Sequence, residues 1–177
     1  MAISHETILK IAGTVDPDLA HIVHREQLTL MIFNDKIVEL CYALRDNPDT
    51  MFDMLTDITA IDYAKKGFRY EVVYFLYSHK YKDRVRIKVL VHEKTLTCPS
   101  MVEVWESANW YERETYDMFG IKFEGHPNIR RFYMPEDFND PESGEPLYPL
   151  RKDFPLGGID GSLPLPPFPE KYGDLKE

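Results

Sequence analysis

The chain has 177 residues, 44% hydrophobic and 13% aromatic, which is enough for a substantial core in one domain of ordinary size. Its formal net charge of −9 argues against nucleic acid as a partner, because phosphate binding depends on clustered Lys and Arg. The start MAISHETILK does not resemble a secretory signal, and no apolar run reaches the roughly 18 to 20 residues of a membrane span. Membrane contact is expected only through a partner.

The first part of the chain predicts a helix followed by a hairpin. Ser4 can cap a short helix that ends at Gly13. The apolar residues 20–23 and 28–33 are typical of two strands, and the polar residues between them are typical of a turn.

A second helix and a strand are expected next. Asn34 can cap a helix ending near Asn47, because apolar residues then recur at spacings of three and four. This apolar stripe consists of Ile37, Val38, Leu40, Cys41 and Leu44. Residues 57–63 mix β-branched residues with acids and predict a strand that stops before the turn at Gly67.

Residues 69–78 and 83–91 predict an antiparallel hairpin joined by HKYK. The second strand alternates so regularly that one of its faces must be buried and the other polar. Its apolar set is Val85, Ile87, Val89 and Val91, and its basic set is Arg84, Arg86 and Lys88.

A break is expected at residues 97–100, with Ser100 capping a short helix over residues 101–105. Helical spacing resumes over residues 108–119, and Gly120 is a stop signal. The following residues predict a loop with short extended pieces near Gly125 and Pro127.

Composition changes at Pro135. Nine of the 13 prolines and five of the nine glycines lie in residues 135–177, with ten acids against four bases. Such a segment forms neither a helix nor an inner strand, so we expect an α+β body over 1–134 and an extended partner-binding tail over 135–177. The body should contain a mainly antiparallel sheet with helices packed on it. The tail includes the proline-rich run LPLPPFP.

Cys41 and Cys98 are far apart in the sequence and form no CxxC pair. They are expected to be unlinked thiols in a reducing compartment, and two thiols cannot hold an iron–sulfur cluster, which takes about four.

Residues 105–154 concentrate charged and aromatic side chains, which indicates either a reaction site or a partner surface. Glu112 and Glu114 do not face each other on a helix, whereas Glu114 and Asp117 do. His126 has no neighbouring nucleophile, and the sequence has no GxSxG, HExxH or GxGxxG pattern. We therefore predict no catalytic, metal or cofactor site in this chain.

Aromatic and arginine side chains anchor many protein interfaces, because they bury a large area with few rotatable bonds. A partner surface is therefore the favoured interpretation of residues 105–154. The alternative for Trp105, Trp110 and Phe119 is that they close the core under the sheet. The predicted partner-interface residues are Glu112, Arg113, Glu114, Asp117, His126, Arg130, Arg131, Arg151, Lys152 and Asp153.

The segment ERETYDMFGIKFEGHPNIRR, followed by MPEDF and YPLRKDFP, resembles the signature of the 30 kDa subunit (the C subunit) of respiratory complex I. The upstream pieces FDMLTDITAIDY, RYEVVYFLYS and RVRIKV also resemble that family, so the likeness covers about residues 28–154.

This resemblance implies a non-catalytic assembly subunit in the peripheral arm of a proton-pumping NADH:quinone oxidoreductase. It implies that the chain docks, near the quinone site, on the subunit of the 49 kDa type. We call this partner the quinone-site subunit. Iron–sulfur subunits are expected nearby, with FMN and the clusters held by partners. The expected place is the cytoplasmic side of the cell membrane, or the matrix side in mitochondria.

Three alternatives remain. The chain could be the equivalent subunit of a relative of complex I that is driven by ferredoxin or a reduced deazaflavin, or of a membrane hydrogenase. It could be a free-standing hydrolase using Glu114, Asp117 and His126, or a binding module outside respiration.

Overall fold

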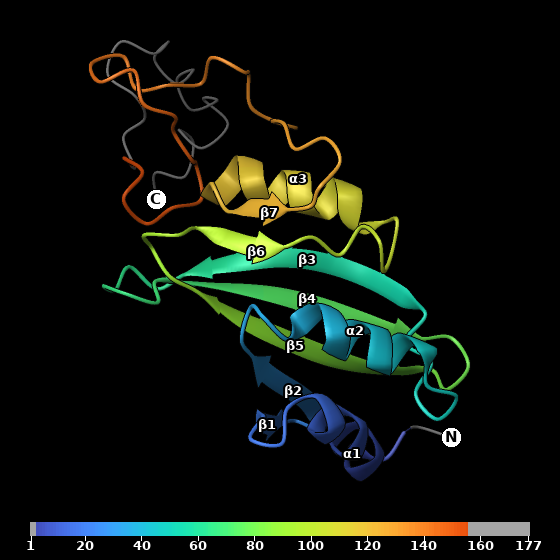
Figure 1. The fold of residues 1–177 in the computed structure, drawn as a ribbon. Coiled ribbons are helices and arrows are strands. Elements are labelled where there is room, and N and C mark those ends of the chain that lie inside the picture. The colour runs from blue at the N-terminus through green and yellow to red at the C-terminus, as the bar shows by residue number, and fades with distance from the viewer. Residues whose placement is uncertain (1–2, 156–177) are drawn as a thin grey trace, which may run out of the picture.

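The computed structural model describes residues 3–155, and its centre is a five-stranded sheet with the order β1-β2-β5-β4-β3 (Figure 1). Two antiparallel hairpins supply four strands, β1 (Ala20–His24) with β2 (Gln27–Ile32) and β4 (Tyr70–Ser78) with β5 (Asp83–Val91). β3 (Met54–Asp62) adds antiparallel to β4, while β2 and β5 pair in parallel. The predicted α+β class with a mainly antiparallel sheet is confirmed, as are both hairpins.

Three helices accompany the sheet in the described part of the chain. α1 (His5–Val15) packs against α2 (Ile37–Asp46), and α3 (Ala108–Phe119) lies along the edge strand β3 (Figure 1). The short parallel strands β6 (Thr97–Pro99) and β7 (Lys122–Glu124) come before and after α3 and pair with each other. This pairing ties the two ends of the α3 region together.

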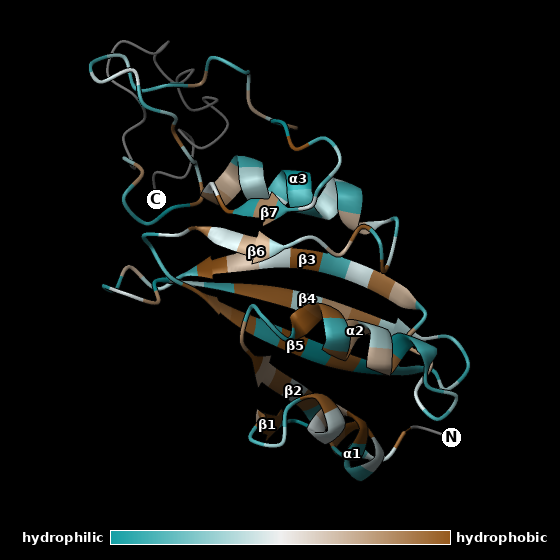
Figure 2. Cartoon of the chain, viewed as in Figure 1, coloured by the Kyte–Doolittle hydropathy of each residue, from teal (hydrophilic) through white to brown (hydrophobic). Residues whose placement is uncertain are grey.

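Apolar and basic residues alternate along β5, and this alternation determines which face of the sheet is buried. The four predicted apolar residues are buried, and the basic residues between them lie on the opposite face, because successive side chains of a strand point to opposite sides. Brown and teal therefore alternate along this strand in Figure 2. The buried stripe of α2 belongs to the same core: Ile37, Leu40, Cys41 and Leu44. Burying one such side chain contributes roughly 1.5 to 3 kcal/mol.

Two predicted caps are wrong, because tertiary partners take the side chains. Asn34 does not cap α2, which begins after Lys36; its side-chain amide instead donates to the carbonyl oxygen of Thr97 at 2.9 Å. Residues 101–105 form one turn rather than a helix, and the Ser100 hydroxyl donates to the Glu112 carboxylate at 2.7 Å.

Several predicted boundaries also shift. The expected break at residues 97–100 contains β6, and the expected strand over residues 57–63 begins earlier, at Met54, with a bulge between Leu55 and Asp57. α1 starts after Ser4 as predicted but continues past Gly13. The helix over residues 108–119 and its stop at Gly120 are confirmed. Cys41 and Cys98 are both free and buried, as expected for unlinked thiols.

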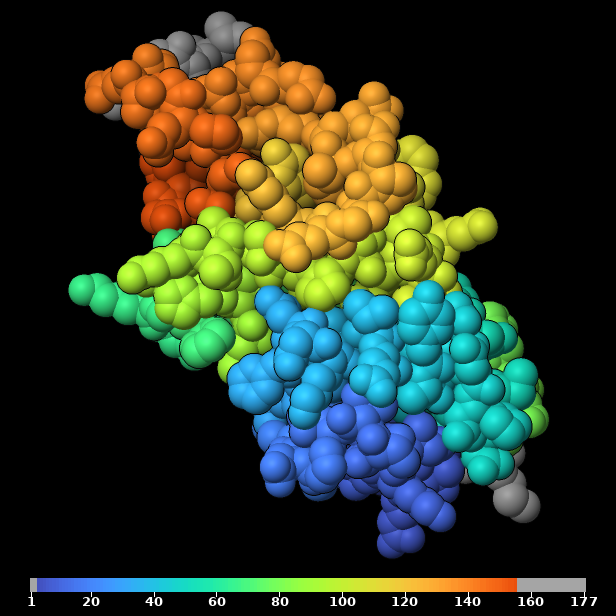
Figure 3. Space-filling model, viewed as in Figure 1, coloured from blue at the N-terminus to red at the C-terminus, as the bar shows by residue number. Residues whose placement is uncertain are grey.

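The first part of the proline-rich segment packs on the chain's own body, beside α3 (Figure 3). The backbone N–H of Leu150 donates to the carbonyl oxygen of Met118 at 3.2 Å, and Arg151 Nε donates to that of Phe119 at 2.6 Å. The end of α3 therefore holds residues 148–151 against the body. The LPLPPFP run lies outside the described residues.

Gly120 gives a direct test of this contact. Its φ of 76° costs an L-residue about 1 to 2 kcal/mol, and an added Cβ would come within 2.7 Å of the Tyr148 ring and collide with the Arg151 guanidinium. We expect Gly120→Ala to lower the free energy of unfolding, measured with denaturant, by more than about 1 kcal/mol. Gly13→Ala is the control, because nothing lies within 4 Å of that Cβ and alanine favours a helix. It should be neutral or stabilising, and similar losses in both variants would contradict the proposed packing.

Candidate partner interface

α3 carries charged side chains on its buried face, which is unusual for a packed helix. Glu112, Arg113 and Asp117 are all buried, so each needs hydrogen-bonding or charged partners inside the molecule. The helix starts after Ser107 and ends at Gly120, whose left-handed backbone and N–H bond to the Tyr116 carbonyl close the last turn. These ends fix which residues face the core.

Asp117 organises the loop after α3. One of its carboxylate oxygens accepts hydrogen bonds from the backbone N–H groups of Phe132, Tyr133 and Met134, at 3.0, 2.6 and 2.8 Å. The other oxygen accepts from Arg131 Nη1 at 3.0 Å. Burial by itself raises the pKa of this carboxyl, but these four donors outweigh burial and lower the pKa. Asp117 is thus a satisfied buried anion.

Arg131 extends this network to the following segment. Its guanidinium also donates to the backbone carbonyl oxygens of Phe138, at 3.1 Å, and Leu147, at 3.3 Å. One Asp–Arg pair therefore links the helix to two separate points of the chain after it. Breaking such a buried pair costs more than breaking a surface pair, because it leaves a desolvated charge without its partner.

Arg113 lies between aromatic rings rather than beside a carboxylate. Its guanidinium carbon is 4.9 Å from the centre of the Trp110 ring and 5.3 Å from that of Phe132. It also donates weakly to the carbonyl oxygens of Arg130 and Arg131, at 3.5 and 3.3 Å. The Trp110 and Phe132 ring centroids are 5.3 Å apart and the rings are tilted by 56°, so the three side chains form one mutually contacting cluster.

Glu112 joins α3 to the segment before it. Its carboxylate accepts from the backbone N–H of Met101 at 2.5 Å and from the Ser100 hydroxyl at 2.7 Å. Burial raises the pKa of this carboxyl to about 7, although the two hydrogen bonds oppose the shift. The group titrates near neutral pH, but it does so inside the body.

A second charged network holds the end of the described chain. Arg69 makes a bidentate pair with the buried Asp62, at 2.8 and 2.6 Å, and also contacts Asp153 at 3.0 Å. The backbone N–H of Lys152 donates to Asp62 at 2.8 Å. Burial by itself raises the pKa of Asp62, but bonds from Arg69, Lys152 and Ala64 bring it to about 2.

Four of the predicted interface residues keep their charged groups at least partly accessible. The side chains of Glu114, Arg130 and Lys152 make no hydrogen bond to another residue in the range 3–155, and Asp153 has its one surface contact with Arg69. Desolvation and the charge of Asp57 raise the pKa of Glu114. These four side chains have accessible charged groups that can pair with another molecule. The other six are used partly or wholly within the chain.

His126 does not complete a reaction site. Its Nε2 donates to the carbonyl oxygen of Asn109 at 3.1 Å, and its Nδ1 accepts the N–H of Asn128 at 3.0 Å. Asp117 is occupied by four donors, so neither group is a free base for the hydrolase alternative. In residues 3–155, no group of three or more His, Cys, Asp or Glu side chains could hold a metal ion. None of the helices described there has the length and apolar content of a membrane span.

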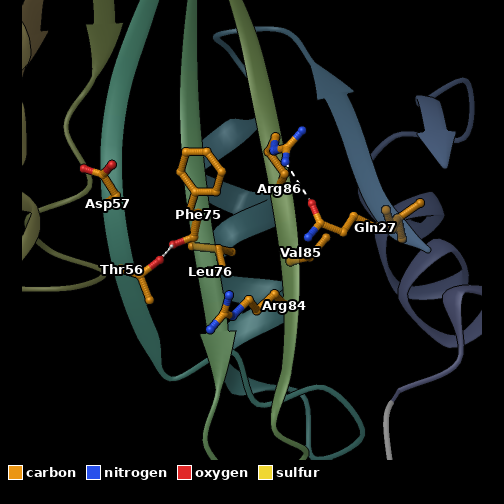
Figure 4. A pocket seen from close by; sticks show the side chains of 9 residues that line it. Gln27, Thr56, Asp57, Phe75, Leu76, Arg84, Val85 and Arg86 are labelled. Atoms are coloured by element: carbon orange, nitrogen blue, oxygen red, sulfur yellow. Dashed lines mark hydrogen bonds between the residues drawn. The ribbon is translucent and has the colours of Figure 1, made fainter. Parts of the chain in front are cut away.

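A hollow of about 430 Å³ lies on the face of the sheet that carries the basic residues of β5 (Figure 4). Thr56 bonds to the Phe75 carbonyl there at 2.9 Å, and Arg86 bonds to the Gln27 side chain at 3.0 Å. The three residues of the hydrolase alternative do not line it. This hollow therefore does not bring the suggested hydrolase residues together.

A family of respiratory subunits matches most of this chain. The family described as "Respiratory-chain NADH dehydrogenase, 30 Kd subunit" matches residues 30–160, which include α3, the Asp117 loop and the Asp62 network. The chain belongs to this family. The resemblance in the sequence is thus confirmed.

Individual relatives support the same family assignment. The chain is 46% identical over 129 residues to the second NADH-quinone oxidoreductase C subunit of Rhizobium meliloti (strain 1021), covering 73% of this chain and 66% of that protein. It is 39% identical over 159 residues to the NADH-quinone oxidoreductase C subunit of Roseiflexus sp. (strain RS-1), covering 89% and 87%. The chain thus spans about two thirds of the Rhizobium relative and most of the Roseiflexus one.

A solved structure shares the fold. A chain in the "membrane-bound sulfane sulfur reductase (MBS), an archaeal respiratory membrane complex" superposes with a TM-score of 0.66 at 30% identity, covering 85% of each chain. The α3 network therefore lies in a fold that a chain of a respiratory membrane complex shares.

The sequence analysis singled out both Asp117 and Arg131 but did not pair them with each other. It missed Asp62 and Arg69 as members of the site, because both lie far from residues 105–154 in the sequence. The available signal was an acidic residue in the buried period of a strand, since Asp62 follows Ile58 and Ala60 at a spacing of two in β3.

Asp117→Asn tests the loop network. The amide supplies only one acceptor oxygen and no charge for Arg131, so we expect the free energy of unfolding to fall by roughly 3 to 5 kcal/mol. Hydrogen exchange at the amides of residues 132–134 should become faster. Asp140→Asn is the control, since that exposed carboxylate bonds only locally, to Glu142 and Ser143. Unchanged exchange at residues 132–134 in the Asp117 variant would contradict the network.

Glu112→Gln tests the buried carboxyl. Because its folded pKa of about 7 lies above the ordinary value of 4.5, the folded state keeps a proton that the unfolded state has lost between these pH values. Stability of the unmodified chain should therefore fall as pH rises from 4.5 to about 7, by roughly 1.4 kcal/mol for each unit of pKa difference. Glu112→Gln can accept the Met101 N–H through its one carbonyl oxygen and donate its amide N–H to the Ser100 hydroxyl oxygen, and it should lose this slope in denaturation series. The exposed Glu103→Gln should retain it; equal slopes in both variants would rule out the effect.

Proposed function

We propose that this chain is a non-catalytic assembly subunit in the peripheral arm of a proton-pumping NADH:quinone oxidoreductase, docked on the quinone-site subunit. The observation that carries the proposal is the use of the family's signature charges to fix a loop and a chain segment on α3. Asp117, Arg131 and Arg151 all bind backbone groups. Side chains used in this way shape a surface rather than perform a reaction.

The remaining charges support docking. Arg130 and Lys152 present cations at the surface, and Glu114 and Asp153 present carboxylates. A surface that carries both positive and negative charges binds best to a partner whose charges lie at matching positions. Such matching contributes more to specificity and orientation than to affinity. The neighbours that the family resemblance implies are the quinone-site subunit and iron–sulfur subunits, which would hold the clusters, with FMN in a further partner. The chain would then lie on the cytoplasmic side of the cell membrane, or on the matrix side in mitochondria.

A related complex is the second candidate. The likeness to a chain of a membrane-bound sulfane sulfur reductase favours it, because the same fold there serves a complex with another name and chemistry. The distinguishing measurement is the set of subunits in the native complex. A flavin subunit that oxidises NADH supports the first candidate, and its absence from an otherwise intact complex supports the second.

Purification of a tagged chain from native membranes tests the proposal directly. We expect the quinone-site subunit and iron–sulfur subunits to copurify in defined amounts. A chain that purifies alone, or whose isolated form hydrolyses a substrate, would contradict the proposal.

Arg130→Ala should lower the amount of assembled complex, because it removes an exposed cation that has no partner in residues 3–155. Membrane NADH:quinone activity should fall in step with the amount of complex, measured on native gels. Lys10→Ala removes an exposed cation from α1 and serves as the matched control. A full amount of complex with lost turnover would show that Arg130 acts in the reaction rather than in assembly.

A further inference from the structure

Three aromatic side chains, one on α3 and two in the loop after it, are exposed and form a continuous row of contacts. Trp110, Phe132 and Tyr133 are 55%, 39% and 58% exposed, and the Phe132 and Tyr133 rings are 4.4 Å apart. With Arg113, whose guanidinium lies over two of these rings, and Arg130, whose backbone carbonyl accepts from Arg113, we call these five residues the aromatic–arginine patch. Contiguous exposed rings of this kind are typical of a binding surface, whereas single exposed apolar residues are not.

The patch is rigid, because the buried network beneath it fixes the backbone. Asp117 binds the N–H groups of Phe132 and Tyr133, and the Arg113 guanidinium lies over both the Trp110 and the Phe132 rings. Rings held in place before binding lose little conformational entropy when a partner arrives. This is the arrangement expected of residues that dominate the binding energy of an interface.

Charge indicates what the patch can bind. Arg113 is buried yet forms no ion pair with any carboxylate in residues 3–155, and Arg130 likewise has none there. The other two buried networks are balanced, Arg131 by Asp117 and Arg69 by Asp62. Two uncompensated cations beside the rings repel a basic segment and attract a carboxylate.

We infer that the aromatic–arginine patch is a docking site for a partner subunit's segment that presents an aliphatic or proline side chain next to a carboxylate. The apolar group would lie on the Trp110 and Tyr133 rings, and the carboxylate would face Arg130 and the edge of Arg113. Arg113 already interacts with the faces of the Trp110 and Phe132 rings, so a cation from the partner would meet a like charge. This inference rests on the proposed function and adds the place and the chemistry of one contact.

The test is a photocrosslink in the assembled complex. Benzoylphenylalanine replaces Tyr133 in the full tagged chain in native membranes, and the linked peptides are identified by mass spectrometry. The expected product joins position 133 to an acidic, apolar segment of another subunit. Benzoylphenylalanine at Phe33, which is 61% exposed but outside the patch, is the matched control and should not reach that segment.

Substitutions give an independent measurement. Trp110→Ala and Arg130→Glu should each lower the fraction of chain retained in the complex about tenfold or more, while Arg130→Lys and Phe33→Ala should retain it. Melting of each purified variant separates lost docking from lost folding. Variants that melt normally and are fully retained overturn the inference.

The possible outcomes distinguish a failure of the docking inference from a failure of the proposed function. A crosslink from position 133 only to residues 156–177 of the same chain, to a second copy, or to a basic segment overturns the inference but leaves the proposed function standing. So does a chain that migrates in the complex with no crosslink from position 133. An unmodified chain that never enters a high-mass complex overturns both.

Discussion

The arrangement of the α3 region depends on a single buried carboxylate. Asp117 accepts three consecutive backbone N–H groups and one arginine, and without it those donors would lie desolvated and unpaired. The position of Phe132 and Tyr133 at the surface follows from these bonds, as does the position of Arg131 against the segment after the loop. A buried charge of this kind specifies one conformation, because few other arrangements would satisfy it.

Charged residues in this chain therefore play two different parts. Those with buried carboxylates, such as Asp117 and Asp62, hold backbone segments that are distant in sequence. Those at the surface, such as Arg130 and Lys152, have no side-chain partner in the part of the chain that the structure describes. Residues 105–154 contain charged residues of both kinds, and this explains why they look like a reaction site when only their order along the chain is considered.

Membership of the family follows from the match over residues 30–160 and the close relatives, whereas docking on particular neighbours is a proposal. The aromatic–arginine patch adds a physical reason for such docking. Rings that stay exposed while buried bonds hold them in place gain most from a partner that covers them, because the cost of ordering them has already been met in folding.

The sequence by itself determined the local elements and the kind of protein: the β4–β5 hairpin, the bounds of α3, the stop at Gly120 and the family. These depend on spacing within a few residues. The structure decided which charges meet, since Asp117 pairs with Arg131 and Arg69 with Asp153 only when segments 14 to 84 residues apart come together. It also corrected the caps at Asn34 and Ser100, because a tertiary hydrogen bond can outcompete a local one that the sequence makes equally available.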